Sequence, residues 1–247
     1  VVLAETKRLV SKGYKELVLT GICTGAYGRD LGGDMNLNKL LQMLKEVPGL
    51  LRIRISSLDP NDFSPELLDT LTGEKIFCPH LHISLQSGND KVLKEMGRKY
   101  TTADFAALVT ELRRRRPEIA ITTDIMVGFP GETQEEHESS LAFVKELALA
   151  GLHVFKYSPR QGTKAAGFPG QVPAPEKEKR SQAFLALGAE LKRAYAAGFL
   201  GRSLEVLVET EGEDGVWEGH TDNYLKVRFK GTGDLRGRLV PVLLGEL

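Results

Sequence analysis

HLHISLQSGNDKVLKEMGRKYT, residues 80–101, is the stretch that decides the fold. It predicts a buried strand, a Gln-Ser-Gly turn, a helix and then an Arg-Lys-Tyr-Thr turn. This order places Gln86 and Arg98 at one end of a barrel, as neutral and cationic partners for a small polar ligand. A second stretch, TTDIMVGFPGET at residues 122–133, adds Asp124 and a backbone turn at the same end.

Strands and helices alternate through the first 157 residues. The predicted strands are 15–21, 52–56, 80–85, 119–127 and 153–157, and the predicted helices are 2–12, 36–46, 64–72, 102–115 and 133–150. This alternation indicates a parallel sheet with right-handed crossovers, and the apolar runs predict strands buried on both faces. Since the series begins with a helix, we expect a further strand before residue 1. The predicted fold is therefore α/β, a partial (βα)6 barrel whose first strand is missing.

Three helix starts carry capping signals. Ser64 precedes Pro65 at the start of one helix, and Thr102 is the expected N-cap of the helix at 102–115. Thr133 and Glu136 have the spacing of a capping box. These signals support the helical interpretation of the segments between the strands.

The pattern changes near the end of the chain. Residues 1–174 form the predicted barrel, and residues 175–200 form a connecting helix. Residues 201–247 contain short strands at 203–209, 223–229 and 237–244 separated by glycine turns. This last segment is the size of a small antiparallel β-barrel of the kind that binds oligonucleotides.

Composition limits the possible classes of function. Lysine plus arginine and aspartate plus glutamate both number 33, so the net charge is zero and does not favour strong non-specific nucleic-acid binding. No apolar run approaches the ~18–20 residues of a membrane span. The two cysteines, Cys23 and Cys78, give no disulfide framework, so we expect a reducing, cytoplasmic location. Nothing in the sequence indicates the oligomeric state.

Small, polar and turn residues follow the predicted strands. Because barrel sites lie at the carboxyl ends of the strands, the residues delivered there are the candidates for ligand binding. They are Thr20, Gly21, Ser57, Gln86, Asp124 and Tyr157, with Arg98 joining them from the turn after the following helix.

Several stretches, taken in order along the chain, resemble signatures of the radical S-adenosylmethionine (SAM) methylthiotransferase family. They are LTGICTGAYGRD (19–30), SSLDPNDF (56–63), LQSGNDKVLKEMGRKYT (85–101), DIMVGFPGET (124–133) and HVFKYSPRQGTKAA (153–166). The segment GHTDNYLKV (219–227) is similar to the RNA-binding TRAM module of that family. One such motif alone is a weak signal, whereas several in register are a strong one.

Two of these stretches also resemble one branch of the family. TGICTGAYG at 20–28 and HTDNY at 220–224 are similar to the branch that adds a methylthio group to C2 of threonylcarbamoyladenosine, beside the anticodon of tRNA. The other branches act on isopentenyladenosine in tRNA or on an aspartate of a ribosomal protein. Both remain alternatives for the substrate.

The resemblance implies SAM and two [4Fe–4S] clusters as cofactors, with tRNA and an electron donor as partners. Reductive cleavage of SAM would give a deoxyadenosyl radical, an auxiliary cluster would supply sulfur, and a second SAM would supply the methyl group. Cys23 and Cys78 cannot provide the three local thiolates of a cluster. We therefore expect the cluster cysteines upstream of residue 1, no metal ligands in this chain, and no activity from this chain alone.

The resemblance also assigns roles at the strand ends. Arg98 would pair with the SAM carboxylate and Gln86 would bind the same amino-acid end. Asp124 and Ser57 would bind the ribose hydroxyls. Backbone groups at Thr20 and Gly21 would accept the ammonium group, and Tyr157 would border the adenine together with the backbone of Val127–Pro130.

Structural roles compete with these assignments. Gln86 is an alternative cap for the helix that follows it, Asp124 a structural hydrogen-bond acceptor, and Arg98 a cation at a helix end. His80, His82 and His153 invite a metal-binding interpretation, but a structural role is favoured for each.

Tyr224, Lys226, Arg228 and Lys230 form the predicted RNA-binding face of the C-terminal segment, with Tyr224 as an aromatic platform. Against this, residues 201–247 hold six basic and nine acidic residues. That excess of acid opposes phosphate binding, so the RNA assignment depends on the resemblance.

Two other classes of protein remain open. One is a non-catalytic RNA-binding protein that keeps a barrel scaffold. The other is an ordinary barrel enzyme that acts on a phosphorylated metabolite. The second would require a catalytic acid and base at the barrel mouth, and only Asp59 and Asp124 are available there.

Overall fold

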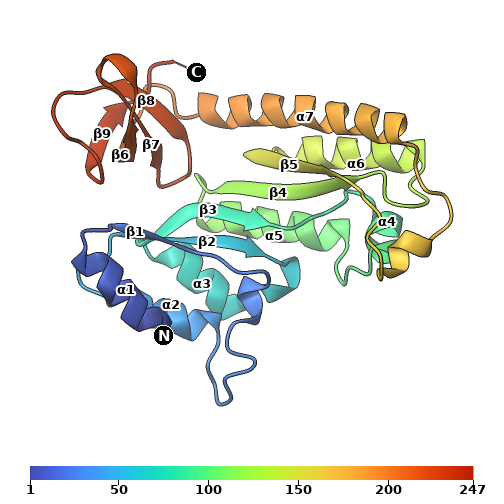
Figure 1. Ribbon diagram of the computed structural model, residues 1–247, viewed down its shortest axis with the longest axis horizontal. Helices are drawn as coiled ribbons and strands as arrows, with labels where there is room; N and C mark the ends of the chain where they lie inside the picture. Colours follow the sequence, from blue (N-terminus) through green and yellow to red (C-terminus); the bar gives the residue numbers. More distant parts are fainter. Residues whose placement is uncertain (247) are drawn as a thin grey trace.

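A curved parallel sheet forms the larger part of the molecule in the computed structural model, which describes residues 1–246 (Figure 1). Its strands are β1 (Glu16–Leu19), β2 (Arg52–Leu58), β3 (Phe77–Ile83), β4 (Ala120–Val127) and β5 (Gly151–Lys156), and they lie side by side in sequence order. The predicted parallel α/β barrel is confirmed. The expected upstream strand remains a prediction, and residue 247, the last of the predicted C-terminal segment, lies outside the described residues.

Helices cover the convex face of the sheet. They are α1 (Val2–Ser11), α2 (Leu37–Lys45), α3 (Pro65–Gly73), α4 (Asp90–Glu95), α5 (Thr102–Arg115) and α6 (Gln134–Leu147). Short 3₁₀ turns lie at η1 (Thr24–Ala26), η2 (Pro60–Asp62), η3 (Lys164–Gly167) and η4 (Glu213–Gly215). Ser64 caps α3 and Thr133 forms the capping box with Glu136, as predicted. The N-cap of α5 is Thr101 rather than Thr102, since the side chain of Thr101 accepts from the backbone N–H of Asp104.

The two faces of the sheet differ in polarity. Ile53, Ile83 and Ile125 point into the core against the helices and are almost fully buried. The alternate residues, including Arg54 and Asp124, point to the concave face. Most residues of β2 and β3 are buried on both faces, as predicted, but the concave face is polar because it lines a cavity.

Helix α7 (Ala174–Ala197) runs along the barrel (Figure 1). Phe184, Leu187 and Leu191 are buried in the main hydrophobic core, and Gly188 lies against Leu152 of β5. The sequence predicted a connecting helix here. In the structure this helix also completes the helical layer over β5. No helix among residues 1–246 is both long and apolar enough to cross a membrane.

A curled antiparallel sheet forms the C-terminal module, which we define as residues 203–246. Its strands are β6 (Ser203–Glu211), β7 (Val216–Thr221), β8 (Lys226–Lys230) and β9 (Leu239–Leu243), in the spatial order β8-β7-β6-β9. The sequence predicted glycine turns between residues 209 and 223 and so missed β7, which contains Gly219. This glycine is in the strand because a Cβ atom there would lie 2.1 Å from the carbonyl oxygen of Leu207 on β6.

The predicted strand at 223–229 begins too early. Residues 221–225 form the tight turn between β7 and β8, closed by a hydrogen bond of 3.0 Å from the backbone N–H of Thr221 to the carbonyl of Leu225. Tyr224 has φ +68° within this turn. We call residues 221–225 the β7–β8 turn.

Two buried arginines on β2 attach the module to the amino end of the barrel. Arg54 donates to the carbonyls of Asp222 (2.9 Å) and Thr221 (3.3 Å). Arg52 donates to the carbonyl of Glu205 at 2.9 Å. Both guanidinium groups face the carboxylate of Glu16 on β1, at 2.9 Å from Arg54 and 3.7 Å from Arg52. Hydrogen bonds from two buried arginine side chains therefore fix the position of the module on the barrel.

Candidate functional site

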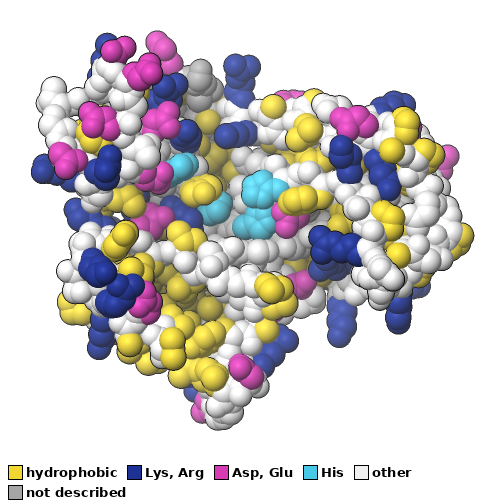
Figure 2. All heavy atoms as spheres, in the orientation of Figure 1, with side chains coloured by type: hydrophobic (Ala, Val, Ile, Leu, Met, Phe, Trp, Pro, Cys, Tyr) yellow, Lys and Arg dark blue, Asp and Glu magenta, His cyan; other side chains and the backbone are white. Residues whose placement is uncertain are grey.

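A cavity of about 350 Å³ opens on the concave face of the sheet, between the barrel and the module. Figure 2 shows histidine side chains gathered in this hollow. The polar residues that line it are Arg54, Ser56, Ser57, His80, His82, Thr122, Asp124, His153 and Tyr224. All except Tyr224 belong to barrel strands, so this pocket is the interior of the predicted barrel.

Asp124 lies at the centre of the cavity between two imidazoles. Its Oδ1 atom is 3.2 Å from Nε2 of His82 and 3.6 Å from Nδ1 of His153. The two imidazole rings stack with their centroids 5.1 Å apart. Burial opposes ionisation of Asp124, but the hydrogen bonds and charges of the two histidines outweigh it and hold the pKa of the carboxyl below its usual value. Asp124 is thus an oriented carboxylate that can accept hydrogen bonds from a ligand.

Strand register brings this group together. Asp124 pairs with His153 across β4 and β5, and His82 pairs with Thr122 across β3 and β4. Nδ1 of His82 shares a hydrogen bond of 3.0 Å with the hydroxyl of Thr122, which turns Nε2 toward Asp124. The sequence alone did not place the histidines beside Asp124. The signal was present in the HLH and TTD stretches, whose alternate residues share one face.

His80 lies deeper in the same cavity. Burial, together with the positive charge of Arg54, lowers the pKa of His80 to about 3, so the imidazole is neutral near pH 7. Its Nδ1 is buried and has no hydrogen-bond partner among the described residues. The ring packs on Tyr224 of the module with 4.5 Å between the centroids. This end of the cavity therefore contains an unsatisfied polar atom.

The donor set of His82, Asp124 and His153 is also one that metal ions accept. The three ligand atoms lie within 4.8 Å of one another. The polar contact of His82 with Asp124 and the stacking of the two imidazoles already account for their arrangement. The two cysteines do not join this group: Cys23 is exposed, and Cys78 is buried in β3, where burial raises the pKa of its thiol to about 12. Residues 1–246 thus offer no thiolate set for an iron–sulfur cluster.

At the carboxyl ends of the strands, Gln86 extends β3 beside β4. Its backbone N–H donates to the carbonyl of Asp124 (2.8 Å), and its carbonyl accepts from Met126 (2.9 Å). Its φ is +71°, an unusual value for a residue other than glycine. The cap of the next helix is Asn89, whose side chain accepts from the N–H groups of Lys91 and Val92. The alternative role of Gln86 as a helix cap is therefore wrong.

The turn after β4 is held in place by a buried ion pair. Glu132 accepts from the backbone N–H of Gly128 (2.6 Å) and from Nη1 of Arg180 on α7 (2.8 Å). Burial raises the pKa of Glu132, although both partners oppose that shift. This arrangement fixes the Gly-Phe-Pro-Gly-Glu turn at the rim of the barrel.

Arg98 also lies at the carboxyl end, in the turn after α4. Its Nη1 is 3.7 Å from Asp59, and its Nε is buried without a hydrogen-bond partner among the described residues. The side chain is about one third exposed. The guanidinium therefore has a donor free for a ligand, and both predicted roles of Arg98, at a carboxylate ligand and at a helix end, remain predictions.

The structure brings only some of the predicted site residues together. Ser57 and Asp124 line the cavity, and the hydroxyl of Ser57 lies 2.9 Å from that of Ser84. Thr20 and Gly21 are exposed in the loop after β1 and do not line the cavity.

Tyr157 is separated from the cavity as well. It is buried in an aromatic cluster with Phe129, at 5.4 Å between ring centroids, and Lys177 donates to its carbonyl (2.9 Å). Its hydroxyl has no hydrogen-bond partner among the described residues. Tyr157 therefore supports the turn after β4, and its contact with an adenine remains a prediction.

The four predicted RNA-binding residues do not form one face. The strand β8 presents Lys226, Arg228 and Lys230 on one side, and Glu218 of β7 pairs with Lys226 (2.8 Å) and Arg228 (2.9 Å). Tyr224 instead points to the barrel, where Arg54 lies 4.6 Å from its ring centroid. Tyr224 is exposed but packs on the barrel, away from the three cations of β8, and its role as an RNA platform remains a prediction.

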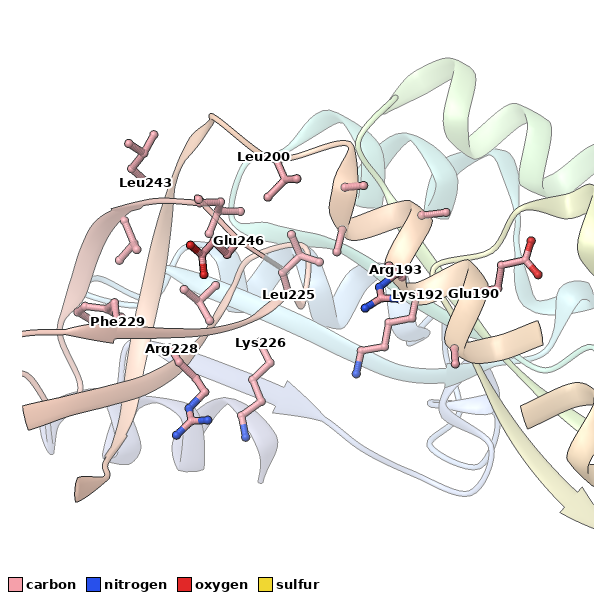
Figure 3. A pocket seen from close by; sticks show the side chains of 18 residues that line it. Glu190, Lys192, Arg193, Leu200, Leu225, Lys226, Arg228, Phe229, Leu243 and Glu246 are labelled. Carbon is pink, nitrogen blue, oxygen red and sulfur yellow. The ribbon is translucent and has the colours of Figure 1, made fainter. Parts of the chain in front are cut away.

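A groove lies between α7 and the module (Figure 3). Lys192 and Arg193 contribute from α7, and Lys226 and Arg228 from β8. Leu200, Leu225 and Val242 provide apolar lining. The basic residues of the module thus lie near basic residues of the helix.

The sequence pattern of the radical SAM superfamily matches residues 1–144, more than half of the chain. The chain belongs to the radical SAM superfamily. This membership confirms the family-level resemblance and argues against an ordinary barrel enzyme that acts on phosphorylated metabolites.

Curated relatives match almost the whole chain. The threonylcarbamoyladenosine tRNA methylthiotransferase MtaB of Bacillus subtilis (strain 168) is 44% identical over 247 residues, covering 98% of this chain and 54% of the relative. The protein of the same name from Thermotoga maritima is 40% identical over 227 residues, covering 92% and 52%. A tRNA-2-methylthio-N(6)-dimethylallyladenosine synthase of Lachnoclostridium phytofermentans is 37% identical, covering 99% and 54%. The chain spans about half the length of these relatives.

Solved structures share the fold. Coproporphyrinogen III oxidase (HemN) from Escherichia coli, described as a radical SAM enzyme, has a TM-score of 0.56 at 20% identity, covering 79% of this chain and 45% of that protein. The radical SAM methyltransferase TsrM from Kitasatospora setae has a TM-score of 0.50 at 20% identity, covering 63% and 30%. At this level of identity the likeness supports the fold and nothing further.

Proposed function

We propose that the natural protein containing this chain is a tRNA methylthiotransferase that adds a methylthio group to C2 of threonylcarbamoyladenosine. The supporting observation is the similarity to the Bacillus subtilis threonylcarbamoyladenosine enzyme. That similarity reaches 44% and extends through both the barrel and the module. It exceeds the 37% to the dimethylallyladenosine synthase of Lachnoclostridium phytofermentans over an equally long match. The proposal includes tRNA and an electron donor as partners and a cytoplasmic location.

The residues present fit SAM. Arg98 has an unpaired buried Nε and a loosely bound Nη1, as expected of a group that receives a carboxylate. Gln86 is held beside Asp124, and Asp124 offers an oriented carboxylate for a ribose diol. When bound, SAM supplies the chemistry that abstracts a hydrogen atom from the substrate, and it is also the source of the transferred methyl group. This chain would contribute binding and orientation, with Ser57, Thr20, Gly21 and Tyr157 as the remaining proposed contacts.

The two iron–sulfur clusters of the proposed enzyme do not fit the cysteines of this chain. An exposed Cys23 and a buried Cys78 cannot supply a set of three ligands. The proposal therefore assigns the cluster ligands to sequence outside residues 1–247.

Analysis of tRNA nucleosides tests the proposal. The gene would be deleted in its own organism, and total tRNA would be digested and examined by liquid chromatography and mass spectrometry. We expect loss of the methylthio form of threonylcarbamoyladenosine and accumulation of its precursor, both reversed by the wild-type gene and not by an Arg98→Ala variant. Loss of methylthio-isopentenyladenosine instead would assign the other tRNA substrate, and unchanged nucleosides would reject the function.

A further inference from the structure

The C-terminal module contributes a wall to the barrel cavity through the β7–β8 turn. Leu225 donates its backbone N–H to the hydroxyl of Thr221 at 2.9 Å, and Asn223 donates to the hydroxyl of Tyr195 on α7 at 3.0 Å. These bonds fix a turn in which Tyr224 has φ +68°, a strained value for a tyrosine. Strain of this kind persists only where the surroundings enforce it, and here they direct the Tyr224 ring onto the barrel.

Tyr224 closes the amino end of the cavity. Its ring packs against His80 at 4.5 Å, stacks on His220 at 4.8 Å and lies 4.6 Å from the guanidinium of Arg54. The side chain nevertheless remains 49% exposed and lines the cavity. We call Arg54, His80 and Tyr224 the floor of the cavity.

The polar groups of the barrel are ordered along its axis. Gln86 and Arg98 follow the carboxyl ends of the strands, and the floor lies toward the amino ends, where Arg54 meets the module. Asp124 and His82 lie in the cavity as well, on β4 and β3. In an adenine, C2 and the N6 substituent project from different corners of the six-membered ring. A base that presents C2 to the carboxyl end therefore directs its N6 substituent away from that end, toward the floor.

The chemistry of the floor suits a polar, negatively charged group. The guanidinium of Arg54 lines the cavity, and with Arg52 it faces the carboxylate of Glu16. His80 is neutral and has an unpaired Nδ1, and the rings of His80 and Tyr224 offer flat surfaces to a planar amide. An isopentenyl group would leave these polar groups without partners, which is costly.

We propose that the floor of the cavity binds the carboxylate-bearing N6 substituent of the target adenosine, with Tyr224 of the module as a specificity-determining residue. This inference rests on the proposed function, because it takes the threonylcarbamoyl group as that substituent. The module then has a role inside the barrel in addition to any contact with the rest of the tRNA.

Paired binding measurements test the inference on the intact natural protein. Dissociation constants would be measured for two samples of one tRNA, with and without the threonylcarbamoyl group. We expect the wild-type protein to bind the modified tRNA more tightly. Tyr224→Leu should weaken binding of the modified tRNA by about tenfold and leave the unmodified tRNA unchanged, since an aromatic stacking contact is worth roughly that factor. Tyr224→Phe should retain most of the preference.

Lys230→Ala is the matched control, because Lys230 belongs to the module and does not line the cavity. It should lower the affinity for both tRNA samples equally or not at all. Equal loss for both samples in Tyr224→Leu, or no loss, would overturn the inference, provided that the melting temperatures of the variants match wild type. The proposed function is judged separately. If the protein carries out methylthiolation but Tyr224→Leu still discriminates between the two tRNA samples as wild type does, only the inference is rejected. If the protein discriminates between the two samples but carries out no methylthiolation, only the function is rejected.

Discussion

The arginines at the two ends of the barrel differ in how many of their N–H groups have hydrogen-bond partners. At the amino end, Arg52 and Arg54 are buried and bonded to Glu16 and to carbonyls of the module. At the carboxyl end, Arg98 has one acidic neighbour, Asp59 at 3.7 Å, and an Nε without a partner among the described residues. Buried polar groups are normally satisfied. Arg52 and Arg54 therefore hold the module on the barrel, whereas the unpaired Nε of Arg98 is the observation behind its proposed role in binding SAM.

The largest expected effect tests the buried arginines at the amino end of the barrel. Arg54→Met keeps much of the packing of the side chain but removes its charge, leaving Glu16 and the carbonyls of Thr221 and Asp222 short of donors. We expect a loss of about 3–5 kcal/mol in the free energy of unfolding, as for other broken buried pairs. Urea unfolding followed by fluorescence and circular dichroism would measure it.

A double variant sharpens that result. In Arg54→Met the carboxylate of Glu16 keeps only the longer contact with Arg52, at 3.7 Å. Glu16→Gln removes that carboxylate, so the two changes together should cost less than the sum of each alone. The exposed pair of Arg228 and Glu218 is the control, and Arg228→Met should change stability by less than about 1 kcal/mol. Additive costs in the double variant would show that Arg54 and Glu16 do not act as a pair.

The second effect tests Arg98 at the carboxyl end of the barrel. Arg98→Ala should weaken SAM binding to the intact protein by about 10–100-fold, the value of hydrogen bonds to a charged group, without changing the fold. Isothermal titration calorimetry would measure the affinity. Arg29 serves as the control, since it also lies 3.7 Å from an aspartate, Asp62, but is 74% exposed. Near-normal affinity in Arg98→Ala would remove this residue from the site.

The third effect concerns the pH dependence of stability at the floor. Unfolded His80 takes up a proton near pH 6.5, whereas the folded protein takes it up only near pH 3. The stability contributed by the neutral imidazole is therefore complete above pH 6.5 and is lost as the pH falls toward 3. The titration of His80 should lower the free energy of unfolding by up to about 1.4 kcal/mol for each pH unit that the pH falls in that range.

His80→Gln removes that titration. Its urea midpoint should fall less than the wild-type midpoint between pH 7 and pH 5.5, and the two proteins should show the same slope between pH 7 and pH 8. Parallel curves down to pH 5.5 would mean that the pKa of His80 is not displaced by burial.

The smallest effect concerns the basic side chains of the module. Glu218 pairs with both Lys226 and Arg228, so part of their charge is already neutralised. Removing either cation should lower tRNA affinity only a few-fold. It should also reduce the slope of the affinity against salt concentration by about the amount expected for one phosphate contact. Glu218→Gln should have the opposite effect, because it releases both cations. Filter binding at several salt concentrations would distinguish the variants, and weaker binding in Glu218→Gln would exclude this face from RNA contact.

Local sequence signals predicted the parallel strands and most of the helices, because both depend on short-range patterns. They also predicted that Gln86 and Arg98 follow the ends of the strands, whereas Asp124 lies within β4 and lines the cavity. The same patterns did not reveal the amino end. Arg54 contacts Asp222 across 168 residues of sequence, and no local signal specifies such a contact.

Errors in the module have a similar physical cause. The residues around Gly219 are predicted as glycine turns, but this glycine allows the close approach of two strands, and Tyr224 looked like part of a strand although it occupies the positive-φ position of a turn. The histidine pair around Asp124 depends on the register of three strands. Register follows from packing and hydrogen bonding along whole strands, which a single motif does not contain.

The phenol of Tyr195 connects the barrel to the C-terminal module. It donates to the carbonyl of Glu118 on the barrel and accepts from the side chain of Asn223 in the module, so one helix ties both halves at the same point. With Arg52 and Arg54 it leaves the halves little freedom to pivot. In the proposed complex with tRNA, this attachment would hold RNA bound by the outer strands of the module at a set distance from the barrel cavity.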